Sequence, residues 1–408
     1  MSPSAVLDGD PVPADGALPD PALAELVGRP LSFYLHVPFC RTRCGYCDFN
    51  TYTAAELGGS GAEGSDGSAY LQAVLAELDL AHRVLGDRAT GVSTVFVGGG
   101  TPTLLPPGDL GRMLSAVDDR FGLLPDAEVT TESNPESVTA AGLVELVEHG
   151  FNRISFGMQS AVPHVLKVLD RIHTPGRPEQ AVLEARAAGF TSISLDLIYG
   201  APGESVADWQ TSVEAAIAAA PDHLSAYALI IEQGTRLERQ IRRGELPAPD
   251  DDDLADKYLL AEQTLTAAGL QAYELSNWAR TPADACRHNL AYWTGGSWWG
   301  VGPGAHSHVG GVRWWNVKHP TAYARRLTDQ TSPGHARELL TETDRRIERV
   351  LLEIRLATGL PVEVLTPTER ERVTPVLERG LGDLVDGRLR LTLAGRLVAD
   401  AVVRDLLH

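Results

Sequence analysis

Three of the four cysteines in this chain lie within eight residues, at Cys40, Cys44 and Cys47, and the fourth, Cys286, is far away in the sequence. Their spacing is C-x3-C-x2-C. Three thiolates on one tight loop can hold three irons of a cubane [4Fe-4S] cluster, which usually takes four cysteines. The pattern therefore predicts a cluster with one open iron, at which a small molecule can bind and react.

Zinc and disulfides are the alternatives for these cysteines. A zinc site usually has two C-x2-C pairs, or Cys and His at a fixed spacing. The nearest histidine, His36, precedes the first cysteine within an apolar run, Leu31 to Val37, which indicates a scaffold residue. Four cysteines in 408 residues do not form the disulfide framework of a secreted protein. The spacing favours an iron–sulfur site, and zinc stays open as the lesser alternative.

The residues from Tyr34 to Phe49 read YLHVPFCRTRCGYCDF. This segment resembles the cluster loop of radical S-adenosylmethionine (SAM) proteins, and among them the branch of coproporphyrinogen dehydrogenases (HemN) and heme chaperones (HemW). The resemblance extends from about Leu31 to the C-terminus. It implies that SAM binds the open iron through the amino and carboxylate groups of its methionine part, and that an electron from the cluster can cleave SAM to a radical.

Six apolar, β-rich runs alternate with helix-period segments along the first part of the chain. We expect strands at Ser32–Val37, Val92–Val97, Glu128–Glu132, Arg153–Phe156, Ser192–Leu197 and His223–Ala228. Strands that alternate with helices imply a parallel sheet with helices outside. Six units are fewer than the eight of a closed TIM barrel. The sequence thus predicts an α/β fold, a partial (β/α)6 TIM-like barrel.

Polar or glycine-rich residues follow five consecutive strands at the same end. The first strand runs into the cysteine loop, and the second is followed by GGGTPT, from Gly98 to Thr103. Glu132 ends the third strand, Gln159 follows the fourth, and Asp196 lies near the end of the fifth. Functional residues of such sheets gather at the carboxyl ends of the strands. These residues are therefore expected to share one site.

The resemblance assigns SAM contacts to a set of residues around this edge. They are Tyr34, Tyr46, Gly100, Thr101, Pro102, Glu132, Gln159, Arg171 and Asp196. It implies that the glycine-rich segment receives the SAM amino group and that Glu132 lies on the SAM side of the pocket. A pocket for a zwitterionic cofactor needs such charged and amide groups. Taken singly, each residue is more often structural, and Tyr46 could equally be an ordinary aromatic of the loop.

A second motif, RHNLAYW, spans Arg287–Trp293. It resembles the HNxxYW motif that is characteristic of the heme chaperones and associated there with heme binding, through His288, Asn289, Tyr292 and Trp293. Histidine can ligate heme iron, and aromatic rings can flank the macrocycle. The structural alternative is that the polar pair caps a loop and the aromatic pair belongs to the core. The nearby lone cysteine is more often a small buried apolar residue than a ligand.

Two departures separate the chain from the dehydrogenases. Phe49 occupies the position at which they carry a further cysteine, and only 39 residues precede Cys40. A radical on a porphyrinogen would be poorly shielded without a longer N-terminal cover. We therefore expect a heme chaperone that binds heme and delivers it to hemoproteins such as respiratory enzymes, with no catalytic residue. The rivals are an oxygen-independent coproporphyrinogen III dehydrogenase of porphyrin biosynthesis and, disfavoured by the SAM-type residues, a simple iron–sulfur electron carrier.

The net charge of -19 argues against a nucleic-acid partner and gives no attraction to anionic lipid. No apolar run is long enough to span a bilayer, and the first 20 residues do not resemble a signal peptide. We expect a cytoplasmic protein, for which a peripheral membrane contact stays open.

The expected organisation has four parts. Residues 1–30, which are rich in proline, are expected to form a disordered or loosely packed arm. A radical SAM core over 31–247 and an extension with the HNxxYW motif over 248–334 follow. Residues 335–408 should form a small, mostly helical, winged-helix-like domain with a hairpin at 387–392. Within the core, Gly58–Ser68 is expected to be a flexible loop.

Overall fold

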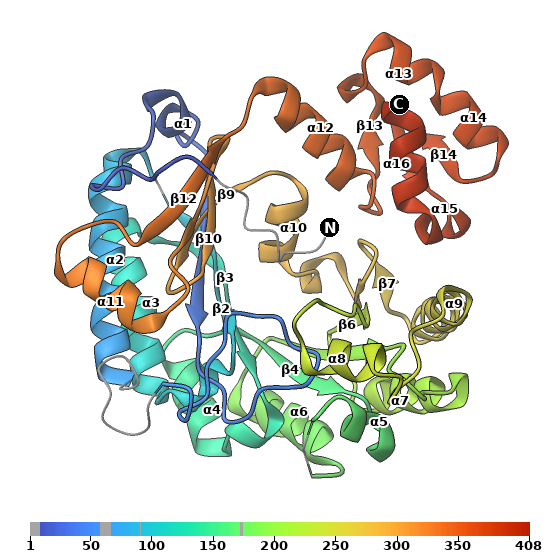
Figure 1. Ribbon diagram of the computed structural model, residues 1–408, viewed down its shortest axis with the longest axis horizontal. Coiled ribbons are helices and arrows are strands. Elements are labelled where there is room, and N and C mark those ends of the chain that lie inside the picture. The colour runs from blue at the N-terminus through green and yellow to red at the C-terminus, as the bar shows by residue number, and fades with distance from the viewer. Residues whose placement is uncertain (1–8, 58–66, 90, 172–173) are drawn as a thin grey trace.

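The computed structural model describes residues 9–57, 67–89, 91–171 and 174–408 (Figure 1). Six parallel strands lie side by side in chain order, and each pairs with the next. They are β1 (Leu31–Val37), β2 (Val92–Gly99), β3 (Leu123–Ser133), β4 (Arg153–Gln159), β5 (Ser192–Tyr199) and β6 (His223–Ala228). The α/β class and all six expected strands are confirmed.

Helices connect these strands and cover the outside of the sheet (Figure 1). They are α2 (Gly67–Leu85), α3 (Pro107–Phe121), α4 (Ala140–Glu148), α5 (Pro163–Val168), α6 (Arg177–Ala188) and α7 (Val206–Ala218), followed by α8 (Arg236–Arg242) and α9 (Asp251–Ala267). Alternation along each strand separates the two faces of the sheet. In β1, Phe33 and Leu35 are fully buried in the main apolar core, whereas Tyr34 lines a cavity on the other face.

The sheet contains twice as many strands as the six that the sequence predicts. Beyond β1 lies β9 (Ser297–Val301), which is parallel to it, followed by β10 (His306–Val309), β11 (Val312–Asn316) and β12 (Gly334–Leu339), all antiparallel. Beyond β6 lie β8 (Asn277–Ala279) and β7 (Gln271–Ala272). The described chain therefore forms one mixed sheet of twelve strands that ends at β12 and β7. The residues between β8 and β9 form α10 (Arg287–Trp293), and α11 (Pro320–Thr328) packs on α2.

The expectation that residues 1–30 form a disordered or loosely packed arm is wrong for residues 9–30. Asp10 pairs with Arg337 of β12, and α1 (Asp20–Ala24) follows. Leu23 and Leu26 are buried in the main core, which holds this segment against the sheet despite its many prolines. Residues 1–8 lie outside the described part, as do residues 58–66 of the expected flexible loop.

The C-terminal residues have an apolar core of their own, which includes Val350, Leu389 and Val402. The elements are α12 (Glu342–Glu353), α13 (Pro367–Glu371), α14 (Val373–Glu378), α15 (Leu393–Leu397) and α16 (Ala399–Leu407), with the small sheet β13 (Leu360–Pro361), β15 (Arg388–Leu391) and β14 (Gly382–Val385). The hairpin expected at 387–392 begins earlier than predicted: β14 pairs with β15, and the expected residues form only its second strand. Figure 1 shows this unit at the upper right, next to α10.

In the part of the chain that the structure describes, short 3-10 helices occupy five connections: η1 (Gly86–Arg88), η2 (Pro102–Leu104), η3 (Pro135–Ser137), η4 (Pro282–Asp284) and η5 (Val362–Val364). None of the helices in the described ranges combines the length and the apolar character that crossing a bilayer requires.

Candidate functional site

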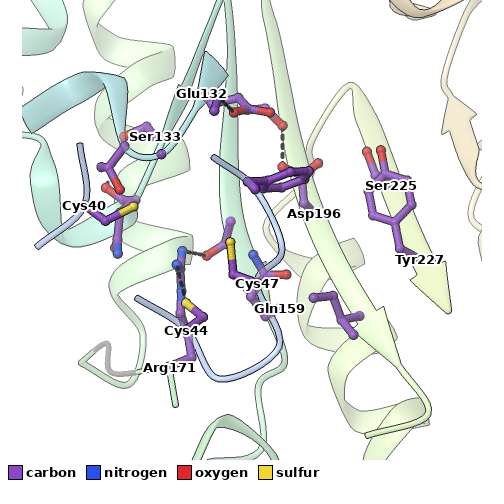
Figure 2. A pocket seen from close by; sticks show the side chains of 18 of the residues that line it. Cys40, Cys44, Cys47, Glu132, Ser133, Gln159, Arg171, Asp196, Ser225 and Tyr227 are labelled. Atoms are coloured by element: carbon purple, nitrogen blue, oxygen red, sulfur yellow. Dashed lines mark hydrogen bonds between the residues drawn. The ribbon is translucent and has the colours of Figure 1, made fainter. Parts of the chain in front are cut away.

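An open cavity of about 1010 Å³ is lined by the inner face of the parallel strands and by the loops that follow them. All the site residues expected from the sequence line it except Pro102, which is buried in η2, and Trp293. Figure 2 shows the three cysteine side chains on one side of the cavity and Asp196, Ser225 and Tyr227 on the strands across from them. The structure therefore gathers residues from distant parts of the sequence around one space.

The cysteine loop leaves the end of β1 and closes on itself. The backbone N–H of Tyr52 donates to the carbonyl of Pro38 at 2.7 Å, and that of Cys40 donates to the carbonyl of Tyr52 at 3.0 Å. Within the loop, the N–H of Cys47 donates to the carbonyl of Cys44 at 3.2 Å. This closure presents the three thiols to the cavity from one short segment.

The donor set of this loop fits an iron–sulfur cluster. In a cubane each thiolate binds its own iron, and the thiols of Cys40, Cys44 and Cys47 all line this cavity. Burial raises the pKa of Cys40 and raises that of Cys47 to about 11, so both are neutral thiols without metal. Cluster binding would therefore release protons.

The glycines after β2 let two segments approach closely. Gly99 has φ +110°, a conformation that favours glycine, and its N–H donates to Glu132 Oε2 at 2.9 Å. A Cβ on Gly100 would lie 2.4 Å from the carbonyl oxygen of Phe39 and 3.0 Å from Cys40 Sγ. Any larger residue at this position would displace the cysteine loop.

Two carboxyl groups, those of Glu132 and Asp196, face the cavity. Burial, then the nearby charge of Asp196, raises the pKa of Glu132 to about 7, although the N–H of Gly99 opposes this. Burial also raises the pKa of Asp196, whose Oδ2 accepts from Ser155 Oγ at 2.8 Å. The charges of Arg153 and Arg171 oppose the shift at Asp196 without reversing it. A ligand with a positive charge or with hydroxyl groups would be stabilised between them.

Gln159 and Arg171 form the edge of the cavity at the end of β4. Gln159 has φ +64°, which is unusual for a residue other than glycine and costs on the order of 1–3 kcal/mol. Arg171 donates through Nη2 to the carbonyl of Gly157 at 2.8 Å and lies 3.8 Å from Cys44 Sγ through Nη1. Its guanidinium thereby joins the end of β4 to the cysteine loop.

His36 connects Tyr34 to the cysteine loop. Its Nε2 is 2.8 Å from the carbonyl oxygen of Asn50, which can only accept, so Nδ1 accepts from the Tyr34 hydroxyl at 3.0 Å. Burial lowers the pKa of His36, which keeps the ring neutral. This bonding agrees with the expectation that His36 belongs to the scaffold.

The HNxxYW motif lies on α10, beside the first halves of β2 and β3 and thus away from the cysteine loop. Both ring nitrogens of His288 have partners: Nδ1 is 2.7 Å from Thr94 Oγ1, and Nε2 is 2.8 Å from Tyr292 Oη. Burial lowers the pKa of His288 to about 3. Glu128 of β3 accepts from the backbone N–H of His288 at 3.0 Å and so fixes the start of the helix.

Sequence reasoning missed the deeper residues of the cavity. Polar side chains that alternate along β4, β5 and β6 line it, namely Arg153, Ser155, Ser194, His223, Ser225 and Tyr227. Parallel strands that are buried on both faces normally read as continuous apolar runs. The alternation in these strands was the signal that one face of the sheet encloses a polar space.

Comparisons with known proteins agree with this geometry. The model of the radical SAM superfamily matches residues 34–216. A protein of Mycobacterium tuberculosis (strain H37Rv) named heme chaperone HemW is 54% identical over 387 residues, which cover 95% of this chain and 97% of that protein. The Escherichia coli K12 heme chaperone HemW is 40% identical over 69% of this chain and 70% of that protein.

A solved structure shares the whole fold. The Escherichia coli coproporphyrinogen III oxidase (HemN), described as a radical SAM enzyme, superimposes with a TM-score of 0.80 and covers 99% of this chain and 96% of its own. Its sequence identity is 24%, so the match concerns the architecture.

Proposed function

The chain belongs to the HemW family of radical SAM proteins, and from this we propose that it binds heme and passes it to other proteins. The observation that carries the proposal is the identity of 54% over nearly the full length of a heme chaperone. The cavity supports it, because the cysteine loop and the HNxxYW motif line the same space.

We propose that Cys40, Cys44 and Cys47 hold a [4Fe-4S] cluster and that SAM occupies the neighbouring part of the cavity. Its contacts would be Tyr34, Tyr46, Gly100, Thr101, Glu132, Gln159, Arg171 and Asp196, with Pro102 shaping the turn from behind. The bound cluster and SAM would together supply one-electron chemistry. The chain itself contributes a buried carboxyl pair, which orients a positively charged group, and Arg171, which lies against a ligand sulfur.

We place heme at the HNxxYW end, with His288 as its candidate ligand and Asn289, Tyr292 and Trp293 around it. A neutral imidazole is the form that binds iron. Because His288 Nε2 is 2.8 Å from Tyr292 Oη, ligation through this nitrogen requires the Tyr292 ring to turn away.

The competing function is oxygen-independent decarboxylation of coproporphyrinogen III, favoured by the shared fold with HemN. Phe49, at the position of the dehydrogenase cysteine, lines the cavity and is 65% exposed. It offers no thiol there, and we propose that the chain lacks this activity.

The two functions separate in one experiment on the anaerobically reconstituted protein. Stoichiometric uptake of heme, followed by its transfer to an apo-hemoprotein such as a respiratory enzyme, supports the chaperone. Turnover of coproporphyrinogen III with SAM and a reductant would refute it.

We further propose a cytoplasmic location, with at most a peripheral membrane contact, and no nucleic-acid partner. A partial (β/α)6 barrel would span 31–247, followed by the extension. The expected boundary at 335 is wrong, because β12 extends to Leu339 and pairs with β11 of the main sheet, so the winged-helix-like domain would begin after β12, with α12. The separate apolar core of the last unit supports its division from the rest.

A further inference from the structure

Arg153, the first residue of β4, is a buried cation whose Nε has no hydrogen-bond partner among the described residues. It is 3% exposed and lines the cavity. Its Nε is buried without a hydrogen bond, and its guanidinium forms no ion pair with any residue in the described ranges. A guanidinium remains protonated in proteins, and an unpaired buried charge is costly. Such a group points to a ligand that brings the opposite charge.

On the side of the cavity that holds the HNxxYW motif, Arg153 is the one positive charge among the residues that the structure describes. His223 and His288 are each 2% exposed, and burial lowers the pKa of both. His223 is bonded through Nδ1 to Ser194 Oγ at 2.8 Å and through Nε2 to Tyr273 Oη at 2.9 Å. Both rings are therefore neutral and already hydrogen-bonded.

The nearby carboxylates are occupied elsewhere. Glu128 accepts the backbone N–H groups of Arg287 at 2.9 Å and of His288 at 3.0 Å. Asp196 accepts from Ser155. Burial works against the charge of Arg153, but neighbours such as Glu128 and Asp196 hold its pKa above the ordinary value. Cys286, whose pKa burial raises to about 12, is a neutral thiol here. The guanidinium thus stays charged and available.

We infer that Arg153 forms a subsite in the deep cavity for one carboxylate of the bound ligand. A planar guanidinium fork matches a carboxylate in two parallel hydrogen bonds. One positive charge among neutral histidines suits a monoanion and does not suit a phosphate, which carries more charge. The subsite lies on the side of the HNxxYW motif, away from the cysteine loop. Given the proposed function, on which this inference rests, the carboxylate is a propionate of the heme.

The test compares ferric heme with its dimethyl ester, which lacks both charges, by anaerobic titration of the cluster-loaded full chain. The wild type is expected to bind heme about tenfold to a hundredfold more tightly than the ester, as suits a charged hydrogen bond. In Arg153→Gln the two affinities should fall within about threefold of each other. Arg153→Lys should keep part of the preference, and Arg83→Gln, an exposed arginine of α2, should keep all of it.

A preference for heme that persists in full in Arg153→Gln overturns the subsite and leaves the proposed function intact. Failure of the wild type to bind either compound refutes the proposed function instead. Thermal unfolding of the heme-free proteins confirms that the variants are folded at the temperature of the titration. Because Glu128 and Asp196 favour the charge of Arg153 in the fold, Arg153→Gln should unfold somewhat below the wild type.

Discussion

Glu132 should make SAM binding depend on pH near neutrality. Its carboxyl lines the cavity and accepts the N–H of Gly99, and its pKa is raised from 4.5 to about 7 by burial and by Asp196. A cationic ligand needs the ionised form. With a pKa of about 7, roughly one-eleventh of the protein is ionised at pH 6 and ten-elevenths at pH 8. The affinity for SAM should therefore rise about tenfold over this interval.

The substitution Glu132→Gln removes that ionisation and keeps an acceptor for Gly99. Its affinity should be low and nearly constant from pH 6 to pH 8. Equilibrium dialysis with SAM on the cluster-loaded chain measures this directly. Glu148→Gln, on the exposed end of α4, is the matched control and should titrate as the wild type does.

The same shift has a consequence for stability without SAM. Because the pKa of Glu132 in the fold lies above its ordinary value, its stabilising contribution is complete below pH 4.5 and is lost as the pH rises through about 7. The difference of about 2.5 pKa units corresponds to about 3.4 kcal/mol at most, since the side chain is partly accessible. Glu132→Gln should thus be more stable than the wild type at pH 8, by urea unfolding. A SAM affinity that stays flat with pH in the wild type, or a variant that is less stable at pH 8, would refute this reasoning.

Three further outcomes are expected. Cys44→Ser should lose most of the iron and the visible absorption of the reconstituted protein, whereas Cys286→Ser should keep both; equal loss in the two would contradict the ligand assignment. Tyr292→Phe should tighten heme binding severalfold, because His288 Nε2 then has no partner to give up, and an unchanged titration would exclude this nitrogen as the ligand. Lys257→Met should lower the free energy of unfolding by about 3 kcal/mol, because Lys257 is fully buried and its loss leaves the buried carboxylate of Glu204 unpaired. An unchanged urea midpoint would be inconsistent with that ion pair.

Local patterns were sufficient to predict the six parallel strands and the edge at which the cysteine loop lies. Each strand is a short β-rich run, and residues such as Glu132 and Asp196 stand near its carboxyl end, where a parallel sheet brings them together. The cysteine spacing needed no tertiary information. These features are local, so a single sequence was enough to predict them.

The parts that were missed depend on pairings between distant segments. β9 lies parallel to β1 although some 260 residues separate them, and no local signal specifies that register. The segment with Leu23 and Leu26 reads as a proline-rich arm, yet it packs because the widened sheet offers an apolar surface. The sequence places Arg153 at the start of a strand, but it does not show that the side chain lines the cavity, because that depends on how the sheet curves.

Asn50, three residues after the last cysteine of the loop, donates through Nδ2 to the carbonyls of Pro303 at 2.9 Å and Lys318 at 2.8 Å. During synthesis, the thiols leave the ribosome while these partners are still untranslated. At 5–20 residues per second, the roughly 270 intervening residues take on the order of tens of seconds. We therefore expect iron–sulfur loading to follow the completion of translation, so that a nascent chain truncated before Pro303 would accept a cluster poorly from a donor protein.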